Sequence, residues 1–157
     1  MTAKADFTPE EWDTVLEGPP SAGSLVVTAS RGGTFRETFA IGKAYTEARQ
    51  QHGASQLLDE IVSAKPKMDH TRYHSVDELK QHALQHIRDA VGTLERKATP
   101  DEVADYRRFV LALADRVANA HREDGMAVSG PEQAAIDEIS TSLGGSDDVS
   151  SAAESGP

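Results

Sequence analysis

Two histidines stand four residues apart in a segment with helical periodicity, and together they could hold a metal ion. His82 and His86 would share one face of a helix, and Glu78 lies one turn earlier on that face. Imidazole nitrogens with a carboxylate as third ligand are typical of zinc and other transition-metal sites. The same pattern also fits an ordinary solvated helix face. No glutamate stands between the histidines to activate a water molecule, as it does in HExxH metalloproteases.

An acidic loop is expected between the last two helices, and its side chains could bind a hard cation. Glu123, Asp124 and Glu132 supply carboxylate oxygens of the kind that Ca²⁺ prefers. The loop is not an EF-hand, because aspartate, asparagine and glycine do not recur at alternate positions. The alternative is structural: Gly125 would end one helix, and Ser129 with Glu132 would begin the next.

The sequence contains no recognisable catalytic motif. There is no cysteine, which excludes disulfides, thiolate metal sites and a cysteine nucleophile. A Gly-x-Ser-x-Gly elbow and paired Glu-x-x-His motifs are also absent. Residues 30–34 (Ser-Arg-Gly-Gly-Thr) could hold an anion at a helix start, but no Lys-Ser or Lys-Thr follows, as a Walker loop requires. We expect a protein that is not an enzyme and requires no cofactor, with Zn²⁺ and Ca²⁺ as the candidate ions for the two sites above.

Capping boxes mark the starts of five expected helices. A serine or threonine at the N-cap, with glutamate three residues later, satisfies two backbone amides that the first turn leaves unpaired. Proline at the first helical position, as at Pro9 and Pro100, strengthens the signal. The five pairs are Thr8/Glu11, Thr34/Glu37, Ser75/Glu78, Thr99/Glu102 and Ser129/Glu132.

Glycine, proline and apolar spacing divide the chain into seven expected helices. Gly18-Pro19-Pro20 is expected to end the first helix, because proline lacks the amide hydrogen that a helix interior needs. Residues 24–29 (Ser-Leu-Val-Val-Thr-Ala) could form a strand, but a lone strand would leave its amides unpaired, so we prefer a short buried helix. The expected helices cover residues 8–17, 21–31, 34–51, 54–64, 75–94, 99–123 and 130–143.

Apolar side chains recur three and four residues apart in these segments and predict a buried core. In residues 75–94 this stripe comprises Val76, Leu79, Ala83, Ile87, Ala90, Val91 and Leu94. We therefore expect an all-α fold, a compact bundle of about six to seven helices that forms a single domain over residues 1–145. Residues 146–157 are small or acidic, and we expect them to form a disordered acidic tail.

The charge balance of the chain is acidic. Its 157 residues include 16 basic and 26 acidic side chains, a formal net charge of −10. Nucleic-acid binding relies on clustered lysine and arginine, and no such cluster is present. No apolar run approaches the ~20 residues of a membrane span, and the first residues lack the blocks of a signal peptide. We expect a soluble, cytoplasmic protein that has no membrane span and does not bind nucleic acid.

Residues 114–144 resemble the second half of a tellurite-resistance TerB-like domain. The matching features are Val117, Ala118 and Ala120, then Asp124-Gly125, Ser129-x-x-Glu132, Ile136, Ile139 and Leu143-Gly144. The resemblance implies an all-helical bundle with a role in stress and metal-ion responses and in scaffolding. It also implies acidic residues that bind divalent cations in some members. In this chain the loop between Asp-Gly and serine is one residue longer than in the family, and the corresponding first-half loop at residues 30–33 contains no acid.

Two functions follow from these observations, and an enzyme whose active site lacks a local motif stays a third alternative. The first is a non-catalytic helical scaffold or binding module with protein partners, in a stress response. The second is a divalent metal-binding protein that uses the His/Glu helix face or the acidic loop. A scaffold predicts an exposed apolar patch with a polar rim. The chain is also compatible with a homo-oligomer, since an amphipathic helix can bury its apolar stripe in a dimer as well as in its own core.

Overall fold

Helices form all the regular secondary structure of the described residues. The computed structural model describes residues 2–29, 35–50, 55–67, 73–123 and 130–144, so the predicted tail at 146–157 lies outside them. The elements are the 3₁₀ helix η1 (Lys4–Asp6) and the α-helices α1 (Pro9–Ala29), α2 (Phe35–Gln50), α3 (Gln56–Ser63), α4 (Val76–Lys97), α5 (Pro100–Glu123) and α6 (Gly130–Ser142). The predicted all-α class is therefore confirmed. None of these helices combines the length and the apolar character that crossing a lipid bilayer requires.

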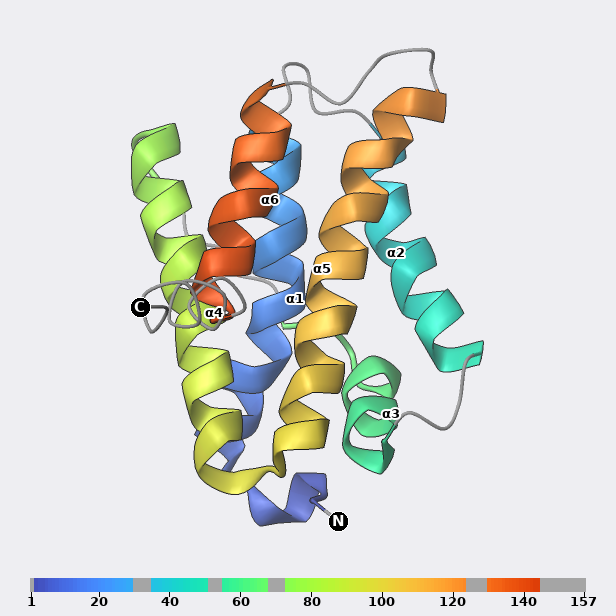
Figure 1. Cartoon of the computed structure of the whole chain (residues 1–157), viewed down its shortest axis with the longest axis vertical. Coiled ribbons are helices and arrows are strands. Elements are labelled where there is room, and N and C mark those ends of the chain that lie inside the picture. Colours follow the sequence, from blue (N-terminus) through green and yellow to red (C-terminus); the bar gives the residue numbers. More distant parts are fainter. Residues whose placement is uncertain (1, 30–34, 51–54, 68–72, 124–129, 145–157) are drawn as a thin grey trace, which may run out of the picture.

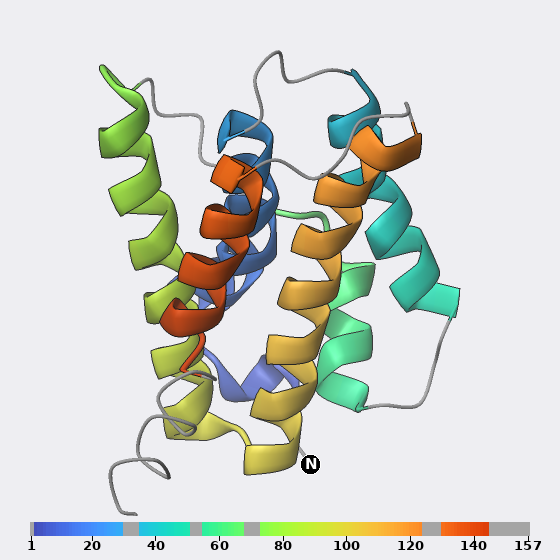
Figure 2. The same ribbon diagram turned by 45° about the horizontal axis from the view of Figure 1, so that its top comes forward.

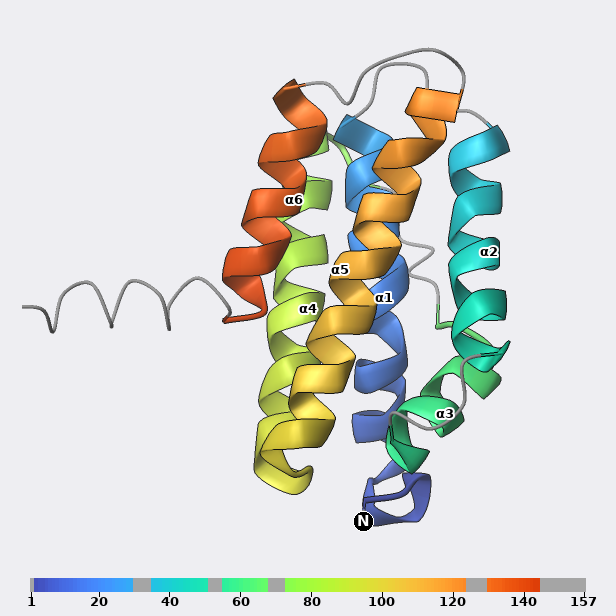
Figure 3. The same cartoon turned by 45° about the vertical axis from the view of Figure 1, so that its right-hand side comes forward.

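Helix α1 lies at the centre of the bundle. It packs against α4 and α5, and α6 contacts all three of these helices (Figure 1). Helix α2 packs on the other flank of α5, and the short α3 contacts both α2 and α5 (Figures 1 and 3). Buried apolar side chains from Phe7 to Leu143 form one contiguous core. Its fully buried members include Val15, Val26, Leu57, Ile87, Leu94, Leu113 and Ile139.

Hydrogen bonds at the helix starts confirm two of the predicted capping boxes in full and a third in part. The Glu11 amide donates to the Thr8 hydroxyl at 3.1 Å, and the Thr8 amide donates to the Glu11 carboxylate at 2.9 Å. Thr99 and Glu102 form the same reciprocal pair at the start of α5. Ser75 caps α4 by accepting the Glu78 amide, but the Glu78 carboxylate accepts the amide of His74 and not that of Ser75, so this third box is half formed. The other two predicted boxes include Thr34 and Ser129, which lie outside the described residues.

The predicted end of the first helix at Gly18-Pro19-Pro20 is wrong. Helix α1 runs through this tripeptide as far as Ala29. Residues 24–29 are helical, as preferred, but they form the last part of α1 rather than a separate helix. The local rule fails at a place where Gly18, Pro19 and Pro20 are all buried among neighbouring helices, and a tertiary hydrogen bond replaces the one that Pro19 removes.

Tyr106 of α5 supplies a hydrogen bond that Pro19 cannot. In a regular α-helix the amide of residue 19 would donate to the carbonyl of Val15, but proline has no amide hydrogen. The buried Tyr106 hydroxyl donates to this Val15 carbonyl at 2.8 Å. Burial raises the pKa of Tyr106 well above its ordinary value of 10.0, so the hydroxyl remains protonated and remains a donor.

Gly18 leaves the space that this contact needs. A Cβ atom at residue 18 would lie 2.1 Å from the Tyr106 hydroxyl oxygen and 3.1 Å from the Ala90 Cβ. Any side chain at this position would therefore push Tyr106 away from the Val15 carbonyl. The neighbours of this glycine come from both α4 and α5.

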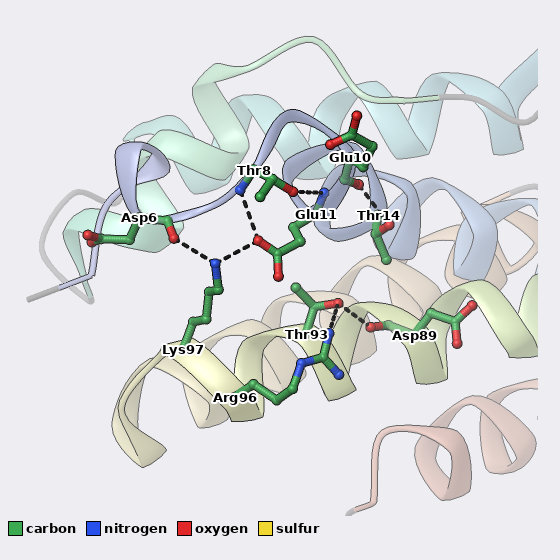
Figure 4. Close-up of polar contacts among 9 residues, drawn as sticks. All are labelled: Asp6, Thr8, Glu10, Glu11, Thr14, Asp89, Thr93, Arg96 and Lys97. Carbon is green, nitrogen blue, oxygen red and sulfur yellow. Dashed lines mark hydrogen bonds and ion pairs between the residues drawn. The ribbon is translucent and has the colours of Figure 1, made fainter.

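The segment before α1 is fixed to the turn between α4 and α5. The Thr2 amide and hydroxyl donate to the Glu102 carboxylate at 3.1 and 2.7 Å. The Lys97 ammonium donates to the Asp6 carbonyl at 2.9 Å and to the Glu11 carboxylate at 2.6 Å (Figure 4). The hydrogen bond from Lys97 also lowers the pKa of the Glu11 carboxyl. The capping glutamates of α1 and α5 therefore also hold this segment in place.

The substitution Tyr106→Phe is expected to lower the free energy of unfolding by about 1–3 kcal/mol, because it leaves the buried Val15 carbonyl without its donor. In a Pro19→Ala background, the amide of residue 19 can donate to the Val15 carbonyl. Tyr106→Phe should therefore lower the free energy of unfolding by less in that background. Urea denaturation of the four proteins in this double-mutant cycle measures the coupling. An equal cost in both backgrounds would contradict the replacement of the proline amide by the tyrosine hydroxyl.

Acid should destabilise the protein in part through Glu102. Burial alone would raise the pKa of this carboxyl, but hydrogen bonds from Thr99 and Thr2 outweigh burial and lower it below 4.5. The ionised Glu102 carboxylate therefore contributes its full stabilisation above about pH 4.5. This contribution is lost as the pH falls through the lower pKa that the carboxyl has in the folded state. Thermal melts of Glu102→Gln between pH 3 and pH 7 should show a weaker acid dependence than the original protein. Superimposable profiles would rule out this role for Glu102.

Candidate functional site

A groove of about 740 Å³ lies between α2, α3 and α5. The views of the bundle place α2 and α3 along the same flank of α5, away from α4 and α6 (Figure 2). Most of the groove belongs to α5, which contributes residues over about four turns. The lining comprises Ala44, Glu47 and Ala48 of α2, Leu58 and Asp59 of α3, and Asp105, Arg108, Phe109, Ala112, Leu113, Asp115, Arg116 and Asn119 of α5.

The floor of the groove is apolar and is built on an aromatic contact. The Phe109 ring meets the Tyr45 ring edge to face, with 5.3 Å between centroids. Tyr45 is buried, and burial raises the pKa of its hydroxyl far above the ordinary value. The other floor residues are small or aliphatic, and they leave a shallow apolar surface between the helices. They are Ala44, Ala48, Leu58 and Ala112, and the groove also borders Leu113, which is fully buried.

The rim of the groove is charged, and its two arginines already have partners. Arg116 of α5 pairs with Glu47 of α2 across the groove. Arg108 pairs with Asp105 within α5. With four carboxylates and two guanidinium groups, the lining has a formal net charge of −2. The groove is therefore electronegative.

Asp59 and Asp115 carry this excess negative charge. Within the part of the chain that the structure describes, no lysine or arginine forms an ion pair with either side chain. Partial burial raises the pKa of Asp115 above 3.8, so its ionised form is less favourable here than in water. Carboxylates that are disfavoured in this way gather at binding and catalytic sites, where a ligand can supply the missing partner.

A second hollow, of about 700 Å³, lies beside the N-terminal segment. It is formed around η1, the start of α1 and Glu60 of α3. The Lys4 amide donates to the Glu60 carboxylate at 2.7 Å, and Asp13 lies 3.9 Å from the Lys67 ammonium. The two carboxylates of this hollow, Asp13 and Glu60, are therefore already engaged. It is lined by Ala3, Lys4, Ala5, Phe7, Thr8, Pro9, Trp12, Asp13 and Glu60.

The predicted metal face on α4 is engaged in other contacts. His86 Nδ1 lies 3.0 Å from the Glu17 carboxylate of α1. The His82 ring stacks on the Tyr73 ring, with 4.8 Å between centroids. The Glu78 carboxylate accepts the His74 amide at 3.2 Å. Across residues 2–29, 35–50, 55–67, 73–123 and 130–144, no three His, Cys, Asp or Glu side chains are gathered around a common metal position.

The predicted acidic loop falls largely outside the described residues. Asp124 lies beyond them, and the side chain of Glu123, at the end of α5, is not described. Glu132 is 1% exposed within α6. The metal site formed by these three residues stays a prediction.

Large hydrophobic side chains are little exposed on this protein. Among the described residues, Val76 stands out with 60% exposure, at the first position of α4, although the sequence places it in the buried stripe. The large apolar patch expected of a scaffold is therefore not found in the described part of the chain. The apolar floor of the groove, with its charged rim, is the surface that remains suited to binding.

Sequence reasoning did not identify the groove residues. Asp105, Arg108, Ala112 and Arg116 recur three and four residues apart beside the apolar stripe of α5, which indicates one common face. The sequence does not show that α2 and α3 border this face. Comparisons with protein-family models, with curated proteins and with solved structures found no match. The resemblance of residues 114–144 to the TerB-like family stays a prediction.

Asp115→Asn should not destabilise the protein at neutral pH and should raise the free energy of unfolding. A raised pKa in the folded state means that folding favours the protonated carboxyl, so the stability of the original protein falls as the pH rises above about 3.8. Asparagine removes this dependence. Urea denaturation should therefore show that the substitution raises the free energy of unfolding at pH 7 but not at pH 3. A loss of stability at pH 7 would show that the Asp115 carboxylate has a stabilising partner.

Proposed function

We propose that this protein is a non-catalytic binding module that holds a protein partner in the groove between α2, α3 and α5. The observation that carries the proposal is the combination of an apolar floor with two carboxylates, Asp59 and Asp115, that lack a cationic partner among the described residues. An apolar floor supplies affinity, and a small number of placed charges supplies orientation and specificity. We further propose that the partner is bound in the cytoplasm.

The shape of the groove favours a polypeptide over a small molecule. Its lining on α5 runs from Asp105 to Asn119, a length of about 21 Å at the rise of an α-helix. A groove of this length between helices is a typical site for an amphipathic helix of a partner protein. The lining contains no hydroxyl, thiol or imidazole group that could act as a nucleophile.

The resemblance of residues 114–144 to the TerB-like family supports a function of the same class. That family is linked to scaffolding in stress and metal-ion responses. The matched segment includes the second half of α5, which carries Asp115, Arg116 and Asn119 of the groove. We therefore place the proposed binding function within a stress response.

Filling the groove should remove the partner without unfolding the protein. Ala112 is exposed and lines the groove, so Ala112→Trp adds a bulky ring there. Ala134 is equally exposed but lies on α6, outside the groove, and Ala134→Trp is the matched control. Each tagged protein is purified from cells that produce it naturally, and the bound proteins are compared by quantitative mass spectrometry.

The expected result is at least one protein that is retained by the original chain and by Ala134→Trp but is lost with Ala112→Trp. Equal thermal melting of the three proteins establishes that the loss does not come from unfolding. Identical sets of bound proteins for all three would contradict the proposed function.

A further inference from the structure

We propose that the segment bound in the groove is a basic amphipathic helix, with lysine or arginine side chains that pair with Asp59 and Asp115 and apolar side chains that rest on the groove floor. This inference deepens the proposed function and depends on it. It names the chemistry of the partner, which neither the fold nor the location of the groove determines alone.

Charge complementarity is the first argument. Among the described lining residues, the two cations, Arg108 and Arg116, already pair with Asp105 and Glu47, so an acidic partner would have to compete with these carboxylates. Asp59 on α3 and Asp115 on α5 lie on different helices that border the groove. A partner with two separated cations can therefore contact both carboxylates at once. Opposite charges at such positions fix the orientation of a partner and speed its association.

The small size of the floor residues is the second argument. Ala44, Ala48 and Ala112 stand where longer side chains would close the channel. Small side chains allow the backbone of an incoming helix to approach closely, so that its apolar residues can contact Leu58 and Phe109. The aliphatic stems of lysine and arginine can also lie along such a floor while their charged ends reach the rim.

The overall charge argues against the other macromolecules that could fill the groove. A second copy of this chain would bring another formal charge of −10 towards an electronegative surface. Nucleic acid would bring phosphates to the same carboxylates. The negative charge of the groove repels both of these alternatives, whereas it attracts a basic segment of a different protein.

Model peptides can test the inference directly. The probe is a fluorescein-labelled helical peptide of leucine and lysine, with the leucines on one face. The matched peptide has glutamate in place of every lysine, and free spermine represents a small polycation without an apolar face. Fluorescence anisotropy gives the affinities at low and high salt, and amide chemical shifts locate the bound peptide on the protein.

The lysine peptide should bind and should shift amides of α2, α3 and α5, whereas the glutamate peptide should not bind. Asp59→Asn and Asp115→Asn should each weaken binding about threefold to tenfold, as expected for one charged contact at a partly exposed site. Asp137→Asn on α6 removes the same charge outside the groove and should leave the affinity within about twofold. Ala112→Trp should abolish the binding.

Four results would overturn the inference. The first three are no binding of the lysine peptide, equal binding to the double variant Asp59→Asn/Asp115→Asn, and amide shifts confined to another surface. Equal affinity for spermine would also overturn it, because the apolar floor would then contribute nothing. The proposed function is tested separately. If Ala112→Trp loses cellular partners but the lysine peptide does not bind, only the basic character of the partner is refuted. If Ala112→Trp loses no partner, the proposal that the groove binds a protein partner is refuted.

Discussion

The hydrogen bond from the Tyr106 hydroxyl to the Val15 carbonyl allows a helix that contains two consecutive prolines to form the centre of this bundle. An unpaired carbonyl in that position would be costly, since it is buried away from water. The same contact fixes α5 against α1, and the glycine at residue 18 keeps the two helices close. Asp105 precedes this tyrosine and Phe109 follows it by about one turn, so the hydrogen bond to α1 and the lining of the groove come from the same part of α5.

The local features of the fold follow from the sequence. Capping pairs such as Thr8/Glu11 and Thr99/Glu102 form as predicted, because both partners lie within one helical turn and need no other part of the chain. The prediction fails at Pro19, because the group that compensates for its missing amide hydrogen lies far away in the sequence. The η1 helix was not expected for a related reason: the Thr2 contacts that hold its segment are made with Glu102, 100 residues later.

The candidate site shows the same division between local and distant information. The recurrence of Arg108, Ala112 and Arg116 is visible in the sequence as one face of a helix, but its neighbours α2 and α3 are not. The histidine face gives the opposite case. The spacing of His82 and His86 correctly indicates a shared helix, yet Glu17 and Tyr73, which these side chains contact, come from other segments. Spacing alone therefore places residues on a helix face without showing what that face meets.

The distance in sequence between Val15 and Tyr106 also bears on how the chain folds as it is synthesised. The two residues are 91 positions apart, so most of the protein must leave the ribosome before the hydroxyl can reach the carbonyl. Until then, the Tyr106 hydroxyl cannot replace the hydrogen bond that is missing at Pro19. Extension of α1 past its two prolines is therefore not stabilised. Vectorial folding from the N-terminus is therefore disfavoured, and the central helix is completed only after the helix that packs on it has emerged.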